Sequence, residues 1–165
     1  MPSVIAMGTG AAARIDVTIV MPCLNEAKWL PACIANAKEA LTRIRAEIGL
    51  NGEILVADNG SADGSQLIAK ALGATLVEVS QPGYGAALAS GMKSASGTFL
   101  VMGDADGSYD FRECVEMIRA LLSGSLHGVA LQRRDQNQRD ALEEPICRQS
   151  SAYRSLEPSI RRRRK

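Results

Sequence analysis

Four carboxylates stand close behind apolar segments of the sequence: Glu26, Asp58, Asp104 and Asp106. Asp104 and Asp106 are separated by one residue, so both side chains can point to the same side of an extended or tightly turned backbone. Two such hard oxygen ligands suit Mg²⁺ or Mn²⁺, which complete their coordination shells with water and substrate phosphates. The pair therefore predicts a divalent-cation site for a diphosphate ligand, with Asp104 and Asp106 as the metal ligands.

The Asp104–Asp106 pair is informative because of its position. A short Asp-x-Asp motif on a surface turn is in most cases merely solvated. Here the pair follows an apolar segment, and acids follow two other such segments, so like charges that meet at close range need a cation to neutralise them. An EF-hand calcium loop is excluded, because Gly107 follows Asp106 directly and the closing Glu of that loop is missing.

The apolar segments have the length and composition of buried strands. We expect strands at residues 15–21, 53–57, 74–79 and 98–102, and a short fifth strand at 128–131. Apolar residues recur three and four positions apart in between, which predicts helices at residues 30–48, 64–72, from about 85 to 95, and 111–122. Pro22 should close the first strand, Pro31 fits the first turn of the first helix, and Gly49 its end.

This alternation of strands and helices predicts the fold class. It indicates an α/β fold in which a mainly parallel sheet is covered by helices on both faces. Ligands of such sheets bind beyond the carboxyl ends of the strands. The topology should therefore bring Glu26, Asp58, Asp104 and Asp106 together in one crevice.

Two turn segments complete the predicted crevice. Asp63, Gly64 and Ser65 have the residue types of a turn and a helix cap. The glycine-rich segment 81–93 has two interpretations of equal weight. Its glycines either form a tight turn before a closely packed helix, or they allow backbone N–H groups at a helix start to approach an anion.

Length and charge limit the class of protein. The chain has 165 residues, enough for one domain with a core of its own. Its net charge of +1 is unevenly distributed, because residues 132–165 carry ten basic and five acidic side chains and the rest of the chain is acidic. An acidic body argues against nucleic acid as the main partner, since phosphate binding needs clustered Lys and Arg.

Cysteine usage and hydropathy indicate the compartment. The four cysteines form no close pair, and the single His127 cannot complete a zinc site with them, which favours free thiols in a reducing cytosol. The N-terminus does not resemble a secretory leader, and no apolar run is long enough to cross a bilayer. We therefore expect no transmembrane segment and a cytoplasmic location.

The composition divides the chain into three segments. Residues 1–13 are small and should be flexible, residues 14–131 should form the folded domain, and residues 132–165 have too few apolar side chains to order themselves and should be a disordered basic tail. Gly8 and Gly10 loosely match a dinucleotide-binding fingerprint. That loop must follow a strand, whereas this segment precedes the first one, so a dinucleotide site is excluded.

Four motifs carry a family resemblance, at residues 19–26, 56–65, 83–87 and 104–106. In this order and at these spacings they resemble the successive motifs of family 2 glycosyltransferases, which have the GT-A fold. The subgroup they resemble most is the dolichyl-phosphate mannose or glucose synthases and their bacterial relatives. The resemblance covers residues 15 to about 122 and implies a Rossmann-like GT-A domain that binds a nucleotide sugar.

The resemblance also implies roles for individual residues. Pro22 and Glu26 would lie at the nucleotide pocket, and Asp58 would contact the base or ribose. Asn59 belongs to the same binding set, although many relatives have a second Asp there, and the neutral amide makes the choice of nucleotide less certain. Asp104 and Asp106 would form the Asp-x-Asp motif that holds Mg²⁺ or Mn²⁺ on the diphosphate of an NDP-sugar donor.

The implied reaction transfers a hexosyl unit from the NDP-sugar to a polyprenyl phosphate, another lipid or a saccharide. The sequence does not identify the base that would deprotonate the acceptor. Relatives continue with an acceptor-side segment and often with membrane helices, and no such pattern follows Leu131. The resemblance thus describes a GT-A domain that is incomplete at its C-terminus, by truncation or frameshift or with a genuine basic tail, so that we expect weak donor binding and negligible transfer.

Two other functions fit parts of the pattern. The chain can be a non-catalytic fragment that binds a nucleotide sugar without turning it over. A receiver-like phosphoacceptor domain also gathers acids around Mg²⁺ at the ends of parallel strands. The receiver is disfavoured, because it would need its acidic pair after the first strand and a lysine after the fifth, and no lysine lies between Lys93 and Lys165.

Overall fold

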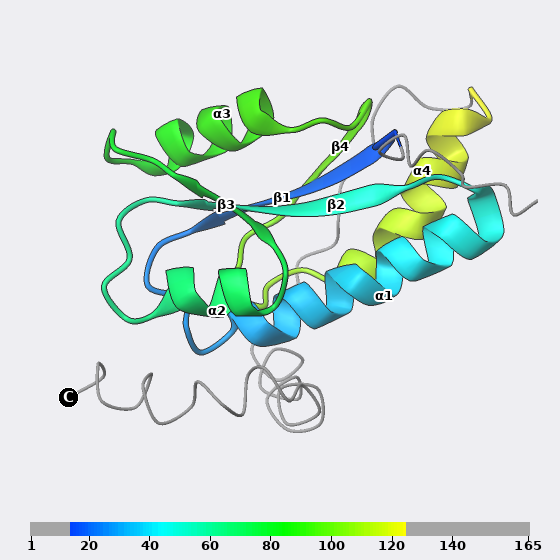
Figure 1. Cartoon of the computed structure of the whole chain (residues 1–165). Coiled ribbons are helices and arrows are strands. Elements are labelled where there is room, and N and C mark those ends of the chain that lie inside the picture. Colours follow the sequence, from blue (N-terminus) through cyan, green and yellow to red (C-terminus); the bar gives the residue numbers. More distant parts are fainter. Residues whose placement is uncertain (1–13, 125–165) are drawn as a thin grey trace, which may run out of the picture.

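The computed structural model describes residues 14–124, which form one sheet with helices on both faces (Figure 1). Its strands are β1 (Val17–Cys23), β2 (Gly52–Asp58), β3 (Thr75–Glu78) and β4 (Phe99–Met102). All neighbouring strands are parallel, and their order is β3-β2-β1-β4. The predicted α/β fold with a parallel sheet is confirmed.

The helices form the two outer layers. They are α1 (Leu30–Ile48), α2 (Ser65–Ala71), α3 (Tyr84–Ser94) and α4 (Cys114–Leu122), with a 3-10 turn, η1 (Phe111–Glu113), before α4. Figure 1 shows α1, α2 and α4 on one face of the sheet and α3 on the other. The single helix predicted over residues 111–122 is thus divided, because the Asp110 side chain accepts the N–H of Arg112 at 3.0 Å and tightens the first turn.

The end of β1 differs from the prediction. Pro22 was expected to close this strand, but β1 continues through Pro22 to Cys23. The carbonyl of Val20 accepts the N–H of Gly103 at 3.2 Å. Pro22 lies two residues further along β1, so its backbone nitrogen faces the same edge of the strand as the Val20 carbonyl. Pairing with β4 ends at Val20 and Met102, so the N–H that proline lacks has no ladder partner there.

The main core lies between the sheet and α1. It contains fully buried Ile19 and Met21 from β1, Ile34 and Ile44 from α1, and Phe111 from η1. α1 ends as predicted at Gly49, which has φ 81° and whose N–H donates to the carbonyls of Ile44 and Arg45. This packing fixes the start of α1, and with it the loop that follows β1.

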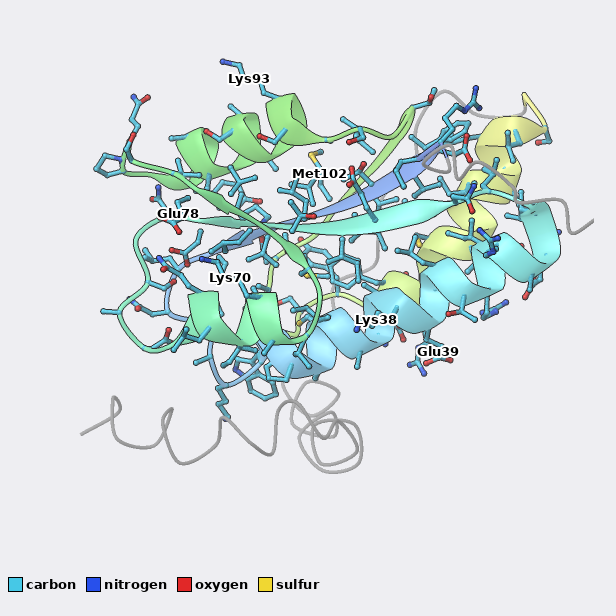
Figure 2. The ribbon with its side chains drawn as sticks, viewed as in Figure 1. Lys38, Glu39, Lys70, Glu78, Lys93 and Met102 are labelled. Atoms are coloured by element: carbon cyan, nitrogen blue, oxygen red, sulfur yellow. The ribbon has the colours of Figure 1, made fainter. Side chains whose placement is uncertain are left out.

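The second face of the sheet carries a smaller core under α3. A Cβ atom at Gly91 of α3 would lie 2.5 Å from Val20 Cγ1, so only glycine permits this close contact. α3 covers β1 and β2, whereas Leu100 and Met102 of β4 remain 43% and 46% exposed. Figure 2 shows Met102 on this side of the sheet, near α3. The structure thus shows a closely packed helix after the glycine-rich segment, and a role of that segment in binding an anion stays a prediction.

Several predictions fall outside residues 14–124. They concern the flexible segment 1–13, the fifth strand at 128–131 and the basic tail at 132–165. Among the residues that the structure does describe, no helix is both long and apolar enough to cross a membrane.

Candidate functional site

A cavity of about 440 Å³ opens at the carboxyl ends of the strands. Its volume lies in the range of small-molecule binding sites. Residues from the end of β1, the loops after all four strands, and the first turn of α3 surround it. They are Pro22, Cys23, Leu24, Glu26, Asn59, Pro82, Gly83, Tyr84, Ala87, Asp104, Ala105 and Asp106. The site is therefore where the predicted topology places ligands.

Five of the six predicted binding residues line this cavity: Pro22, Glu26, Asn59, Asp104 and Asp106. The expected convergence of carboxylates is thus partly observed. Within residues 14–124, however, no three His, Cys, Asp or Glu side chains come close enough to hold one metal ion together. A cation at this site has at most a pair of carboxylate ligands from the described chain.

Asp58, the sixth predicted residue, lies under the loop after β2 instead of in the cavity wall. It is 1% exposed, and its Oδ2 accepts hydrogen bonds from the N–H groups of Gly60 and Ser61 at 3.1 and 3.0 Å and from Gln66 Nε2 at 2.6 Å. Its Oδ1 is buried without a hydrogen-bond partner among residues 14–124. In this structure Asp58 holds its own loop, and its contact with a base or ribose stays a prediction.

The loops after β1 and β2 are joined by side-chain bonds. Three consecutive backbone N–H groups, at residues 25–27, donate to the second loop. The pairs are Asn25 N to Ser61 Oγ (2.8 Å), Glu26 N to Ser65 Oγ (3.0 Å) and Ala27 N to Asp63 Oδ2 (2.8 Å). Asn25 adopts a left-handed φ of 59°, and its Oδ1 accepts the N–H of Ala62 at 2.9 Å. These bonds fix the backbone from which Glu26 reaches the cavity.

Asp63 forms the turn that the sequence predicts. Its Oδ1 accepts the N–H and the hydroxyl of Ser65 at 3.0 and 2.6 Å. Burial raises the pKa of the Asp63 carboxyl, but the hydrogen bonds from Ser65 and from the Ala27 N–H outweigh burial, so the pKa lies below its ordinary value. The α2 helix starts at Gly64 without a side-chain cap, so the predicted capping role is replaced by this bridge between loops.

Asn59 connects the loop after β2 to the loop before α3. Its Nδ2 donates to the carbonyl of Gln81 at 2.8 Å and lies 3.5 Å from that of Val79, and its Oδ1 accepts the N–H of Gly83 at 2.7 Å. Gly83, with φ 115°, is the residue from which α3 starts. Both groups of the Asn59 amide are thus used on the protein backbone.

The acidic pair lies beside a turn and a tyrosine. Asp106 Oδ1 accepts the Ser108 N–H at 2.8 Å and its Oδ2 accepts the Ser108 hydroxyl at 2.8 Å. Tyr84, the first residue of α3, lines the cavity together with Asp104. Partial burial raises the pKa of Tyr84, and the neighbouring Asp104 carboxylate raises it further, so the Tyr84 hydroxyl stays protonated beside Asp104.

The donor atoms present fit a divalent cation with few protein ligands. Asp104 Oδ1 is buried and has no hydrogen-bond partner among residues 14–124. A buried carboxylate oxygen without a partner is costly unless a cation or water meets it. Mg²⁺ and Mn²⁺ commonly take one or two carboxylates and fill the remaining positions with phosphate oxygens and water. The acidic pair therefore fits an ion that reaches the site with a diphosphate.

Sequence reasoning assigned no role to two residues in the cavity wall, Cys23 and Tyr84. Burial, the largest cause, raises the pKa of the Cys23 thiol to about 11, so this thiol is protonated at neutral pH and is a poor nucleophile. Cys23, Cys33 and Cys114 are free thiols, as predicted. Tyr84 lines the cavity from the first turn of α3, and its place between two glycines at a helix start was the signal in the sequence.

Comparison with known proteins decides the family. The family model for glycosyl transferase family 2 matches residues 18–164. The chain belongs to this family. The match includes the motifs at residues 19–26, 56–65, 83–87 and 104–106, and it also extends beyond residue 131, where the sequence alone placed the end of the domain.

Two curated relatives illustrate the similarity. The low-salt glycan biosynthesis hexosyltransferase Agl6 of Haloferax volcanii is 36% identical over 108 residues, which are 66% of this chain and 25% of Agl6. The uncharacterized glycosyltransferase Mb0553 of Mycobacterium bovis is 35% identical over 109 residues, which are 66% of this chain and 45% of Mb0553. The chain thus spans a quarter to just under half of the length of these relatives.

A solved structure supports the GT-A fold. Glucosyl-3-phosphoglycerate synthase of Mycobacterium tuberculosis superposes with a TM-score of 0.51 at 25% identity, over 67% of this chain and 41% of the synthase. Another crystal structure of that synthase contains Mn²⁺, UDP and glucosyl-3-phosphoglycerate; it matches this chain with a TM-score of 0.47 at 25% identity, over 69% of this chain and 40% of the synthase. Resemblance to dolichyl-phosphate synthases in particular stays a prediction.

Proposed function

We propose that the cavity binds an NDP-sugar and that the chain provides the donor side of a hexosyl transfer. One observation carries this proposal: the acidic pair Asp104 and Asp106 lines the same cavity as the first turn of α3, in a member of glycosyl transferase family 2. The first turn of a helix leaves backbone N–H groups without intrahelical acceptors and favours anions. The proposed site thus combines carboxylates for a cation with N–H groups of the first turn of α3 for phosphate.

Each part of the cavity then has a task. Asp104 and Asp106 hold Mg²⁺ or Mn²⁺, and the N–H groups that start α3 at Tyr84 face the diphosphate. When bound, the cation stabilises the negative charge that builds on the departing nucleoside diphosphate. Pro22 at the end of β1 and Glu26 in the loop after it border the nucleoside, and the hydrogen bonds between this loop and residues 61–65 keep Glu26 in place.

The acceptor is proposed from the family resemblance. It is a polyprenyl phosphate, with another lipid or a saccharide as the alternative. The relative Agl6 is named a hexosyltransferase of glycan biosynthesis, which supports a hexosyl group as the unit transferred. The described residues do not identify the base that deprotonates the acceptor.

A second candidate function is donor binding without transfer. It is favoured by the described residues, which provide the cavity for a donor and identify no base for an acceptor. A positioned acceptor and base are needed for transfer in addition to the donor site. Binding and transfer are therefore tested separately.

Calorimetry of the full chain with UDP-glucose and GDP-mannose tests the donor site, in Mn²⁺ and in EDTA. We expect binding of at least one donor in Mn²⁺ and its loss in EDTA. Asp104→Asn should weaken this binding strongly. The control Glu39→Gln changes an exposed carboxylate on α1, labelled in Figure 2, and should bind like wild type. Equal affinity in Mn²⁺ and EDTA would refute the metal site.

Transfer is measured with a radiolabelled donor and a short-chain polyprenyl phosphate. The full chain is compared with a preparation without Mn²⁺. Binding without transfer supports the second candidate. Robust transfer by the 165-residue chain supports the first and contradicts the expectation of negligible activity that the sequence gives for its C-terminal segment.

A further inference from the structure

We propose that Asn59 is a positioning residue that holds the start of α3, and through Tyr84 sets the geometry of Asp104. That Asn59 holds the loop before α3 rests on contacts within the protein, and the consequence for cation binding rests on the function proposed above. Asn59 was expected to contact the nucleotide; here it acts on the protein itself.

The first step is the set of bonds that Asn59 makes across the cavity rim. One amide group donates to the Gln81 carbonyl at 2.8 Å, and the other accepts the Gly83 N–H at 2.7 Å. Two of the backbone groups of the loop are thus tied to one side chain, which comes from a loop more than twenty residues earlier in the chain. The bonds fix the loop on both sides of Pro82.

The loop before α3 needs these hydrogen bonds to be ordered. Residues 80–85 are exposed, so this loop has little apolar contact with the rest of the protein. α3 is anchored further along, where Ala87 and Gly91 are buried against the sheet. A loop of this kind has low local stability unless hydrogen bonds order it. Asn59 supplies these bonds at the point where the helix begins.

The third step concerns the choice of an amide. Asn59 meets carbonyl oxygens with its Nδ2 and an N–H group with its Oδ1. A carboxylate only accepts hydrogen bonds, so it would keep the bond to Gly83 and place a negative oxygen against the Gln81 carbonyl. The bonding pattern therefore favours Asn over Asp at this position, where the family resemblance leads one to expect an acid in many relatives.

The fourth step leads to the acidic pair. Tyr84 directly follows Gly83 and lines the cavity with Asp104, whose carboxylate interacts with the tyrosine hydroxyl. Residues that orient a metal ligand commonly affect metal affinity about 10–100-fold. Releasing Gly83 from Asn59 frees the backbone that carries Tyr84, and the Tyr84 hydroxyl then no longer keeps a fixed place beside Asp104.

The test compares Asn59→Leu, which has a similar shape without hydrogen bonds or charge, with wild type. Amide exchange by NMR reports the Gly83 N–H, and electron paramagnetic resonance measures Mn²⁺ affinity without nucleotide. We expect Gly83 exchange to be at least about tenfold faster and Mn²⁺ affinity about tenfold lower. Asn59→Asp should leave Gly83 protected, because it retains the acceptor. Unchanged Gly83 exchange in Asn59→Leu overturns the proposal.

The control is Asn51→Leu. Asn51 also uses both of its amide groups, donating to the Arg14 carbonyl at 3.2 Å and accepting from Arg45, but it precedes β2, at the opposite end of the sheet from the cavity. Its replacement should leave both Gly83 exchange and Mn²⁺ affinity at wild-type values. An equal effect of Asn51→Leu shows that loss of stability alone is responsible, and it overturns the proposal.

A double-mutant cycle with Tyr84→Phe tests the route from Asn59 to the metal. If Asn59 acts through Tyr84, Asn59→Leu lowers Mn²⁺ affinity in the wild-type background and has little further effect beside Tyr84→Phe. Additive losses refute this route. If the wild-type chain binds no Mn²⁺, the proposed function fails, while Gly83 exchange and the NMR resonances of the Tyr84 ring still decide whether Asn59 holds the loop.

Discussion

The sequence Asp-Gly-Ser occurs twice, and the structure uses the two copies for different purposes. In both Asp63-Gly64-Ser65 and Asp106-Gly107-Ser108, the aspartate accepts the N–H and the hydroxyl of the serine two residues later. Both glycines have positive φ, 99° and 79°, and both serines are fully buried. Locally, the two turns differ only in that one oxygen of Asp63 accepts both bonds, whereas each oxygen of Asp106 accepts one.

The tertiary surroundings of the two turns differ. The second oxygen of Asp63 accepts the N–H of Ala27, 36 residues away, and joins two loops. Asp106 instead lines the cavity together with Asp104. One turn serves as a structural joint and the other as part of the candidate metal site. The comparison teaches that the same local motif becomes structural or functional according to which strand it follows and what lies beside it.

The largest expected effect is a loss of ligand binding when Asp106, the aspartate of the cavity turn, is replaced. Asp106→Ala should weaken Mn²⁺-dependent binding of UDP-glucose roughly a hundredfold or more, since it removes a proposed metal ligand. Its free energy of unfolding should fall by only about 1 kcal/mol, the cost of the Ser108 bonds. Calorimetry and urea denaturation measure the two quantities. A grossly unfolded Asp106→Ala protein would contradict the assignment of this turn to function.

The converse effect is expected at the structural turn. Asp63→Ala should lower the free energy of unfolding by about 2–3 kcal/mol, because it leaves the N–H of Ala27 without its charged acceptor. Urea denaturation followed by circular dichroism measures this loss. The fraction of the Asp63→Ala protein that remains folded should still require Mn²⁺ for donor binding. A loss of stability no larger than that of Asp106→Ala would remove the distinction between the turns.

Acid should selectively weaken the structural turn. The folded pKa of Asp63 lies below its ordinary value of 3.8, so ionised Asp63 stabilises the fold above that pH, and this contribution is lost as the pH falls through the folded pKa. The stability difference between wild type and Asp63→Asn should be full near neutral pH and shrink below pH 3.8. Urea denaturation across this range checks it; a difference that grows in acid has the wrong sign.

The smallest effects should be equal in the two turns. Gly64→Ala and Gly107→Ala each force a residue with a Cβ into a left-handed conformation, at a cost of about 1–2 kcal/mol. Because both φ angles are local properties of the turn, we expect the two losses of unfolding free energy to agree within about 0.5 kcal/mol. Thermal denaturation compares them. Clearly unequal losses would show that the turns differ already at the level of the backbone.

The strands and helices were largely readable from the sequence because their signals are local. The apolar runs that became β1 and β2 and the periodicity of α1 gave the correct elements, and Gly49 gave a correct end. The end of β1 was predicted wrongly at Pro22, because a proline ends a strand only where the neighbouring strand needs an N–H at that position. That neighbour, β4, ends before Pro22, which only the pairing of strands reveals.

The sequence predicted those parts of the candidate site whose position depends on strand topology alone. Strand ends of a parallel sheet meet at one edge, and this placed Glu26, Asp104 and Asp106 at the cavity. The partners of individual polar groups were beyond the sequence. Asn59 hydrogen-bonds to the loop before α3, and Asp58 accepts hydrogen bonds from its own loop. These partners depend on how the loops pack together, which the sequence does not give.

The two Asp-Gly-Ser turns mark the boundary between these kinds of information. The sequence by itself determined that each turn forms, because aspartate, glycine and serine have the local hydrogen-bonding and backbone preferences that such a turn requires. Only the tertiary structure decided that Asp63 meets the N–H of Ala27 and that Asp106 meets the cavity. A carboxylate has more acceptor sites than a local turn uses, and the fold determines which group occupies the remaining ones.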